Sequence, residues 1–347
     1  MDSRRLRFVV ATLVSVSLLG GLLASVPQFS SAATTLDGKK ERVSVFGENG
    51  EDEFRSIVKA SDGTLVAAGI TTTNTIGDYG GSDGFVTKIN QDAVGLWSTN
   101  IGGTSFDAFY SITEASDGGF VMAGGTTSLD FTGSLDPNRK SRDAAIAKIG
   151  PLNNQLWAQA TGGGGDDFFN GVAACPDTGF IAVGWSDSLD GDIWDPINPD
   201  GGQDGIIVKY DKDGTKKWLR STGGTNDDGL LSVAVAADGG FVVAGYTSST
   251  NKDISTNSKS APKGGQDGFI IRFDKWTNIL WEANVGGSAL DNLQTVAFTS
   301  DGGVVAVGVT YSTDGDAVKN KGGMDGLMIK LDKNGNKQWS RTFGGAG

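Results

Sequence analysis

The sequence contains no histidine, one cysteine (Cys175) and only seven prolines among its 347 residues. The absence of histidine excludes Ser-His-Asp and Cys-His catalytic machinery, His-ligated zinc or copper, and imidazole acid–base chemistry. A single cysteine excludes an internal disulfide bond, and its position in an apolar stretch is typical of a buried structural thiol. Any catalysis would therefore depend on carboxylates, lysine, tyrosine or a bound cation.

Long apolar runs are also scarce, and the only one of near-spanning length lies at the N-terminus. Three arginines within residues 4–7 precede an uncharged apolar stretch over residues 8–26, and Ser-Ala-Ala follows at residues 31–33. This pattern predicts a signal peptide over residues 1–33 and a secreted or cell-surface protein with no transmembrane segment after cleavage. Retention of the stretch as a membrane anchor is the alternative.

Basic residues are outnumbered by acidic residues, 29 to 41, which gives a formal net charge of −12. Such a balance argues against nucleic acid as a partner, because phosphate backbones bind to basic surfaces. The acidity is consistent with the solubility of an exported protein, and also with cation binding on one face of the molecule.

What the sequence does contain is an internal repeat. Residues 46–347 divide into five segments of 55 to 63 residues and the start of a sixth: 46–100, 101–160, 161–221, 222–284, 285–342 and 343–347. An aspartate lies six residues into each full segment: Asp52, Asp107, Asp167, Asp228 and Asp291. A tryptophan stands near each segment end: Trp97, Trp157, Trp218, Trp281 and Trp339. A repeat of this period is typical of solenoids, propellers and arrays.

The apolar runs within one segment predict four short strands. In the fourth segment these runs cover residues 231–236, 241–246 and 268–273 and a stretch around Trp281, and Gly/Asp turns separate them. No segment shows a sustained 3.6-residue period, so helix should be nearly absent. We therefore predict an all-β protein, a β-propeller of four-stranded antiparallel blades with five repeats visible.

Ring closure is left open by the sequence. Residues 34–45 copy the end of a repeat, with Arg42 at the tryptophan position, and therefore predict an N-terminal strand equivalent to the last strand of a blade. Either five blades close alone, or the chain is a fragment of a six- or seven-bladed propeller. We expect a monomer unless the ring is open, because an open arc exposes sheet edges.

Three stretches resemble the repeat of the bacterial secreted SBBP-type β-propeller family. They are DGFVTK at residues 83–88, WSTNIGG at residues 97–103 and DGGFVMAGGTTS at residues 117–128. The Asp-turn-Trp ending at residues 332–339 is distantly similar to quinoprotein-like propeller repeats, although its turn is one residue shorter. The SBBP resemblance implies a propeller in a secreted or surface-exposed bacterial protein, in a family that has no common catalytic residues.

The interval between the second and third strands varies most between segments, and variable loops on a rigid scaffold are where binding sites usually lie. In the third segment this loop holds Asp190, Asp192 and Asp195, and Asp314 and Asp316 repeat the Asp-Gly-Asp pattern in the fifth. Clustered carboxylates suit Ca²⁺, which takes six to eight oxygen ligands. The alternative is a solvated acidic loop whose aspartates bond to their own turns.

Aromatic residues near the same loops are candidate ligand contacts. Trp194 has no counterpart in the other segments, so it could stack on a sugar ring or pack across the base of its loop. Trp185, Tyr246 and Tyr311 are weaker candidates on the same face. The aspartates and tryptophans that recur in every segment are instead interpreted as structural, capping the Gly-Gly turn and docking against the next blade.

The leading hypothesis is a non-catalytic exported propeller that binds a polysaccharide or a surface protein through its variable-loop face, with calcium as a candidate cofactor. One alternative is a carboxylate-based glycan-active hydrolase or lyase on the same scaffold. Another is a structural spacer module of a larger surface protein. No catalytic residue is assigned, and we favour a binding role over an enzymatic one.

Overall fold

A computed structural model describes residues 30–36, 39–45, 50–72, 81–132, 141–193, 202–250, 263–317 and 320–345, and for the first two ranges only the course of the backbone. These residues form antiparallel β-sheet with a single 3-10 turn, Gly191–Ile193. The prediction of an all-β fold is confirmed. Within the described ranges no helix is long and apolar enough to cross a membrane.

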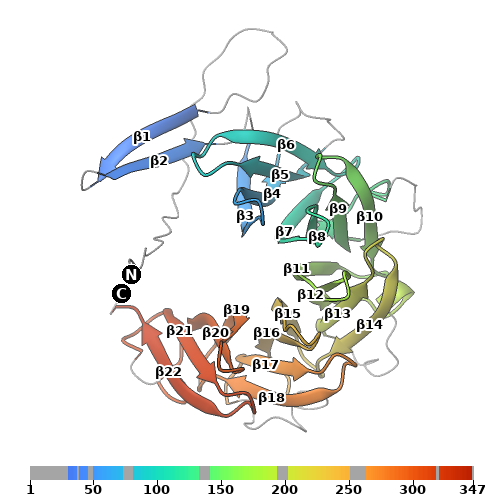
Figure 1. Ribbon diagram of the computed structural model, residues 1–347. Helices are drawn as coiled ribbons and strands as arrows, with labels where there is room; N and C mark the ends of the chain where they lie inside the picture. The colour runs from blue at the N-terminus through green and yellow to red at the C-terminus, as the bar shows by residue number, and fades with distance from the viewer. Residues whose placement is uncertain are drawn as a thin grey trace.

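Five four-stranded sheets follow one another along the chain, each in the strand order of the sequence (Figure 1). Blade one is β3 (Asp52–Lys59), β4 (Leu65–Thr71), β5 (Asp83–Ile89) and β6 (Gly95–Ile101). Blade two is β7 (Asp107–Glu114), β8 (Phe120–Thr126), β9 (Asp143–Ile149) and β10 (Gln155–Thr161). Blade three is β11 (Asp167–Ala174), β12 (Phe180–Ser186), β13 (Asp204–Tyr210) and β14 (Lys216–Thr222). Blade four is β15 (Asp228–Val235), β16 (Phe241–Thr247), β17 (Asp267–Phe273) and β18 (Ile279–Val285). Blade five is β19 (Asp291–Phe298), β20 (Val304–Thr310), β21 (Asp325–Leu331) and β22 (Lys337–Phe343).

We call the four strands of a blade a, b, c and d in chain order. In the fourth segment the sequence predicts strand a from residue 231, whereas β15 begins at Asp228. The strand starts earlier because Asp228 pairs in register with Thr247 at the end of β16 and its carboxylate is buried there. Burial of a charged residue at a strand end is not visible in an apolar pattern, so the prediction missed these three residues.

A β-bulge interrupts strand a of every blade at the same place. The pairing of strands a and b shifts by one residue after Phe54 in blade one and after Phe109 in blade two. The residue after the bulge then offers its amide to the preceding blade: the amide of Ile112 donates to Ser56 Oγ over 3.3 Å. Such a bulge bends strand a and connects the innermost strands of consecutive blades.

A cation on strand c, buried in four of the five blades, ties each blade to its own a–b turn. Lys148 Nζ lies 2.6 Å from Asp117 Oδ2, and its side chain is 5% exposed. The same ammonium lies 5.7 Å from the ring centre of Phe180 in the next blade. The equivalent pairs are Lys88–Asp62, Lys209–Asp177, Arg272–Asp238 and Lys330–Asp301. An aspartate in the a–b turn of each blade thus pairs with a cation of strand c.

The hydrophobic core lies between the blades rather than within them. Phe109 of blade two packs in one cluster with Val66 and Val86 of blade one, and all three side chains are fully buried. The other three junctions are built in the same way. Burying one such phenylalanine contributes about 1.5–3 kcal/mol, so each junction depends on a few large side chains of strand a.

The five blades form an arc, with blade one and blade five as its ends (Figure 1). A separate two-stranded sheet, β1 (Ser30–Leu36) and β2 (Lys39–Val45), extends from blade one on the side where the arc is open. The sequence predicts one strand over residues 34–45, whereas the structure has a hairpin. Its first strand begins at Ser30, inside the segment that the sequence predicts to be cleaved.

Candidate binding face

The d-to-a and b-to-c connections meet at one end of the blades and hold each other in place. In blade two, the amide of Ser105 in the d-to-a connection donates to Ser128 Oγ in the b-to-c connection over 2.8 Å. The amide of Thr104 donates to Asp130 Oδ1, also over 2.8 Å. The start of the variable loop is therefore fixed to the preceding connection, and this end of the molecule is a preorganised surface. We call it the loop face.

The aspartate at the start of strand a forms the centre of each clamp. Asp107 Oδ2 accepts hydrogen bonds from the Gly103 amide and from Ser128 Oγ, both over 2.7 Å. The same clamp joins Asp167 with Gly163 and Ser188, Asp228 with Gly224 and Ser249, and Asp291 with Gly287 and Ser312. In blade one the described hydroxyl partner of Asp52 is Thr71, and the residue 21 positions after Asp52 lies outside the described residues. The serine was missed from the sequence, although it stands 21 residues after the aspartate in four segments.

Burial makes these clamp aspartates harder to ionise. Desolvation raises the pKa of Asp107 and of Asp228, although neighbouring hydroxyls and a glycine amide act against it. For Asp167, desolvation and the nearby charge of Asp143 raise the pKa to about 7, against the lowering effect of its serine hydrogen bonds. Asp107, Asp167 and Asp228 are therefore buried structural groups whose pKa lies above that of an exposed aspartate.

The d-to-a connection contains a pair of glycines because carboxylates crowd its backbone. A Cβ atom on Gly102 would lie 2.1 Å from Asp83 Oδ1 and 2.8 Å from Asp107 Oδ2. No side chain fits between these two oxygens without displacing one of them. The glycine-rich turns, including residues 162–165, therefore leave room for the clamp.

The aspartates predicted as calcium ligands belong to the b-to-c connections of blades three and five. Asp190 Oδ1 accepts a hydrogen bond from the Gly164 amide, and Asp192 Oδ1 lies 2.9 Å from Lys216 Nζ. Asp314 Oδ1 accepts from the Ser288 amide over 2.7 Å, and Asp316 pairs with Lys337. Asp195 lies outside the described residues. Four of the five carboxylates thus have protein partners, and the described part of the chain contains no group of three or more potential metal ligands.

Two of the four aromatic candidates are held within the scaffold. Trp185 stacks on Phe168 at a centroid distance of 6.3 Å and 22° between ring planes, and Arg142 lies 5.7 Å from its ring. The Tyr246 hydroxyl donates to Gln203 Oε1, and burial, together with the charge of Asp227, raises the pKa of Tyr246 to about 12. These side chains stabilise loop bases and present little free ring surface.

Tyr311, in contrast, is exposed and belongs to an apolar patch. Leu290, Tyr311 and Met324 are 43%, 47% and 55% exposed, respectively. They flank Asp291, Thr310 and Asp325, which pair side by side at the loop end of blade five. The Tyr311 amide also donates to the Leu290 carbonyl over 2.9 Å, so the first two side chains project from hydrogen-bonded neighbours. The fourth candidate, Trp194, lies outside the described residues.

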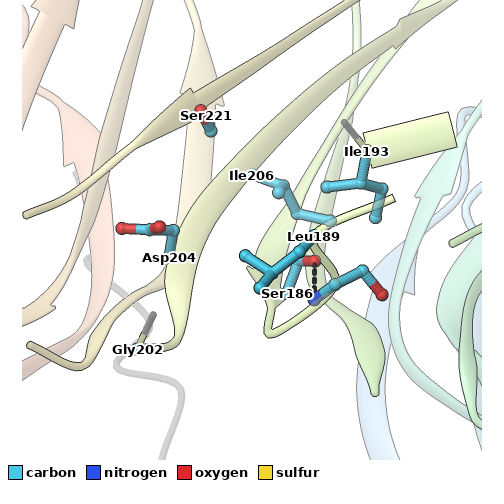
Figure 2. Close-up of a pocket in the computed structure, with 8 residues that line it drawn as sticks. Ser186, Leu189, Ile193, Gly202, Asp204, Ile206 and Ser221 are labelled. Atoms are coloured by element: carbon cyan, nitrogen blue, oxygen red, sulfur yellow. Dashed lines mark hydrogen bonds between the residues drawn. The ribbon is translucent and has the colours of Figure 1, made fainter. Parts of the chain in front are cut away.

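The loop face also contains a small cavity in blade three, lined by Ser186, Leu189, Ile193, Gly202 and Asp204 among others (Figure 2). Its volume of about 20 Å³ is room for roughly one water molecule, because a water needs at least about 10–15 Å³ on this measure. The Ser188 amide donates to Ser186 Oγ over 3.0 Å at its wall. This cavity is too small to hold a sugar or a side chain of a partner.

A wider hollow of about 320 Å³ lies at the opposite end of the blades. It is lined by Glu114, Cys175 and Phe180, among others. Ser61 donates to Glu114 through its amide and its hydroxyl, so the carboxylate joins blades one and two. Burial raises the pKa of the Cys175 thiol, which makes it a poor nucleophile.

The recurrent tryptophans lie at the outer part of the blade junctions. Trp157 Nε1 donates to the Lys212 carbonyl of the next blade over 3.1 Å, and Trp281 Nε1 donates to the Lys333 carbonyl over 3.0 Å. The Trp97 ring lies 6.4 Å from that of Phe120 in the next blade. Trp339 is the exception, because no further blade follows it in the described structure.

No model of a known protein family matches the chain. The regulatory protein FlaEY of Caulobacter vibrioides is 26% identical over 271 residues, which cover 75% of this chain and 28% of that protein. The chain thus corresponds to just over a quarter of the length of this relative. The SBBP-type assignment stays a prediction.

Solved structures resemble the chain only at low scores. A eukaryotic initiation factor aligns with a TM-score of 0.40 and 9% identity, over 91% of this chain and 63% of that chain. A putative gluconolactonase aligns at 0.37 and 10% identity, over 83% and 75%. The haemagglutinin-neuraminidase ectodomain of parainfluenza virus 5 aligns at 0.34 and 10% identity, over 84% and 72%. Similarity at this level says nothing about activity.

Proposed function

We propose that the protein is a non-catalytic, exported binding protein that contacts a ligand at the cell surface through its loop face. The observation that carries this proposal is the patch formed by Leu290, Tyr311 and Met324, three exposed apolar side chains on a hydrogen-bonded, preorganised end of blade five. Contiguous exposed apolar side chains on a rigid scaffold are a feature of interaction sites.

A protein ligand fits this patch better than a polysaccharide. Methionine and tyrosine are enriched at protein interfaces, whereas sugar recognition needs aromatic faces, and here Tyr311 is the only aromatic member. The Caulobacter relative is named a regulatory protein, which agrees with a binding role. Export is supported by the signal-peptide pattern of residues 1–33.

The test is binding of labelled protein to intact bacterial cells, before and after protease treatment of the cells, and to purified cell-wall polysaccharide. We expect saturable binding that protease removes and that the Tyr311→Ser/Met324→Ser double variant weakens by roughly a hundredfold, because truncating a central interface residue costs about 1–2 kcal/mol and 1.4 kcal/mol is tenfold. Leu152→Ser is the matched control, since Leu152 is highly exposed in a turn at the opposite end of blade two.

Equal binding by the double variant and the wild type would contradict the proposal. Binding that survives protease treatment of the cells and also occurs on the purified cell-wall polysaccharide would favour the carbohydrate alternative. Calcium dependence of either interaction would support the calcium hypothesis at the acidic loops.

A further inference from the structure

The hollow at the opposite end of the blades has its structural origin in blade three. Strand a of blade five ends at Phe298, and Arg272 of blade four lies 4.8 Å from the centre of its ring. The equivalent residue of blade three is Ala174, whose methyl group is too short to reach the preceding blade in the same way. A hollow of about 320 Å³ therefore lies between the a–b turns of blades two and three, lined by Glu114 and Thr178, among others. We call it the turn hollow.

The a–b turn of blade three departs from the repeat at a residue that lines the turn hollow. The other four a–b turns have glycine at this position, with φ between +79° and +86°: Gly63, Gly118, Gly239 and Gly302. Blade three has Thr178 instead, with φ at +68°. This conformation is costly for a residue with a Cβ atom, and most of all for a β-branched one. Strained residues of this kind cluster at functional sites, so Thr178 indicates a role beyond forming the turn.

The charges around the turn hollow leave one carboxylate without a cation. In the two turns that border it, Asp117 lies 2.6 Å from Lys148 and Asp177 lies 2.7 Å from Lys209. Glu114 accepts hydrogen bonds from the amide and the hydroxyl of a serine in blade one. Within the described part of the chain it has no lysine or arginine partner. The turn hollow therefore has one uncompensated negative charge in its wall.

We propose that the turn hollow binds a primary ammonium group carried on a short aliphatic chain. A carboxylate has about four acceptor sites, and three of those on Glu114 are used, so one is left for an ammonium donor. The hydroxyl of Thr178 would accept a second of its hydrogen bonds. Ala174 and Cys175 offer apolar contacts to the aliphatic chain. A volume near the lower limit for ligand pockets, about 300 Å³, suits a ligand of this size.

An anion and a guanidinium group both suit the turn hollow less well. The lysines at its border are already paired with aspartates, and the carboxylate of Glu114 would repel an anion. A guanidinium group binds best when both oxygens of a carboxylate are free to accept its two parallel N–H donors. Both oxygens of Glu114 already accept hydrogen bonds from blade one. An ammonium group is a compact charge that needs only one of them.

The thiol of Cys175 provides a direct probe of this site, because it lines the turn hollow and is the single cysteine of the chain. The experiment is modification of this thiol by methyl methanethiosulfonate in rising concentrations of butylammonium chloride, at constant ionic strength. At ten times its dissociation constant, butylammonium should slow the modification about tenfold, because the occupied hollow shields the thiol. Butanol, which has the same chain without the charge, should leave the rate unchanged.

Two variants separate the charge from the fold. Glu114→Gln keeps an acceptor for the serine of blade one but removes the charge, so half-protection should need about tenfold more butylammonium. Glu51→Gln is the matched control, since it removes the same charge from an exposed residue at the loop face. The rise in melting temperature on adding butylammonium does not depend on the thiol, and it should follow the same order.

Thr178→Gly tests whether the strained residue serves the ligand. This variant restores the glycine of the other four blades, so its melting temperature should rise above that of the wild type. Half-protection should nevertheless need several-fold more butylammonium, because a hydrogen bond to the charged group is lost. A gain in stability with unchanged protection would overturn the role given to Thr178.

A second arm of the experiment replaces butylammonium with acetyl-lysine amide. Protection at lower concentrations by the lysine derivative would support a polypeptide side chain as the source of the ammonium group, and the reverse order would support a free amine. Equal protection by butanol and butylammonium, or equal protection of the Glu114→Gln and wild-type proteins, would overturn the proposal. The turn hollow lies opposite the loop face, so these results are independent of the function proposed above.

Discussion

Truncating the same repeat position in two blades should have very different effects on stability. Phe109 is fully buried between blades one and two, whereas Phe54 is 41% exposed and keeps its main contact within its own blade, stacked on Phe85 at 5.6 Å. Replacing a buried phenylalanine by alanine removes its transfer free energy and leaves a cavity, for a total of about 3–5 kcal/mol. At the exposed position no cavity forms and only part of the transfer term is lost, roughly 1 kcal/mol.

The free energy of unfolding of Phe54→Ala, Phe109→Ala and the wild type should be compared by urea titration followed by circular dichroism. Because consecutive blades contact only their neighbours, unfolding of the array can occur in steps, and the slope of each transition must be compared as well as its midpoint. We expect Phe109→Ala to lose at least twice the stability that Phe54→Ala loses. Equal losses at the two positions would refute the reasoning, since they would mean that Phe54 is packed like its equivalents.

Three further outcomes follow from the charges. Between about pH 4 and pH 7 the native state holds a proton on Asp167 that the unfolded state has released. The free energy of unfolding should therefore fall with rising pH, by at most about 1.4 kcal/mol per pH unit. In thermal unfolding curves measured across this range, Asp167→Asn should flatten the slope. Asp117→Ala should lower the free energy of unfolding by about 1–2 kcal/mol because it leaves the buried Lys148 ammonium unpaired, whereas Lys148→Met should cost less than about 1 kcal/mol; the reverse order of the two melting temperatures would contradict this interpretation. If the acidic loops bind calcium, millimolar Ca²⁺ should raise the melting temperature and Asp190→Asn should remove the effect; no change on adding calcium or chelator would show the calcium hypothesis to be wrong.

The fold could be predicted from the sequence because the repeat encodes it locally. Apolar runs of strand length, Asp-Gly turns and a constant spacing gave four antiparallel strands per segment and five segments, as the structure shows. The first residues of strand a were missed because a buried aspartate looks polar in the sequence. Asp228, for example, is a charged residue whose side chain is fully buried.

The candidate site was less predictable, because it depends on contacts between segments of variable length. The role of Asp107 depends on Ser128, 21 residues further along the chain, and a spacing alone does not say which groups meet. The exposed patch around Tyr311 combines residues from the ends of three strands, and Tyr311 is the only aromatic residue among them. The exposure of Phe54 could not be predicted from the repeat either, since its segment has the same pattern as the buried ones.

The openness of the arc is the central claim, and thiol labelling tests it most directly. In a Cys175→Ser background, a cysteine placed at Ile57 and one placed at Ile112 occupy the same repeat position, with 51% and 6% exposure of the native side chains. We expect the Ile57→Cys thiol to react with a maleimide at close to the rate of a free thiol, and the Ile112→Cys thiol to be strongly protected until the protein unfolds. Equal protection at both positions would contradict the account, because it would mean that the leading face of blade one is covered like every other junction.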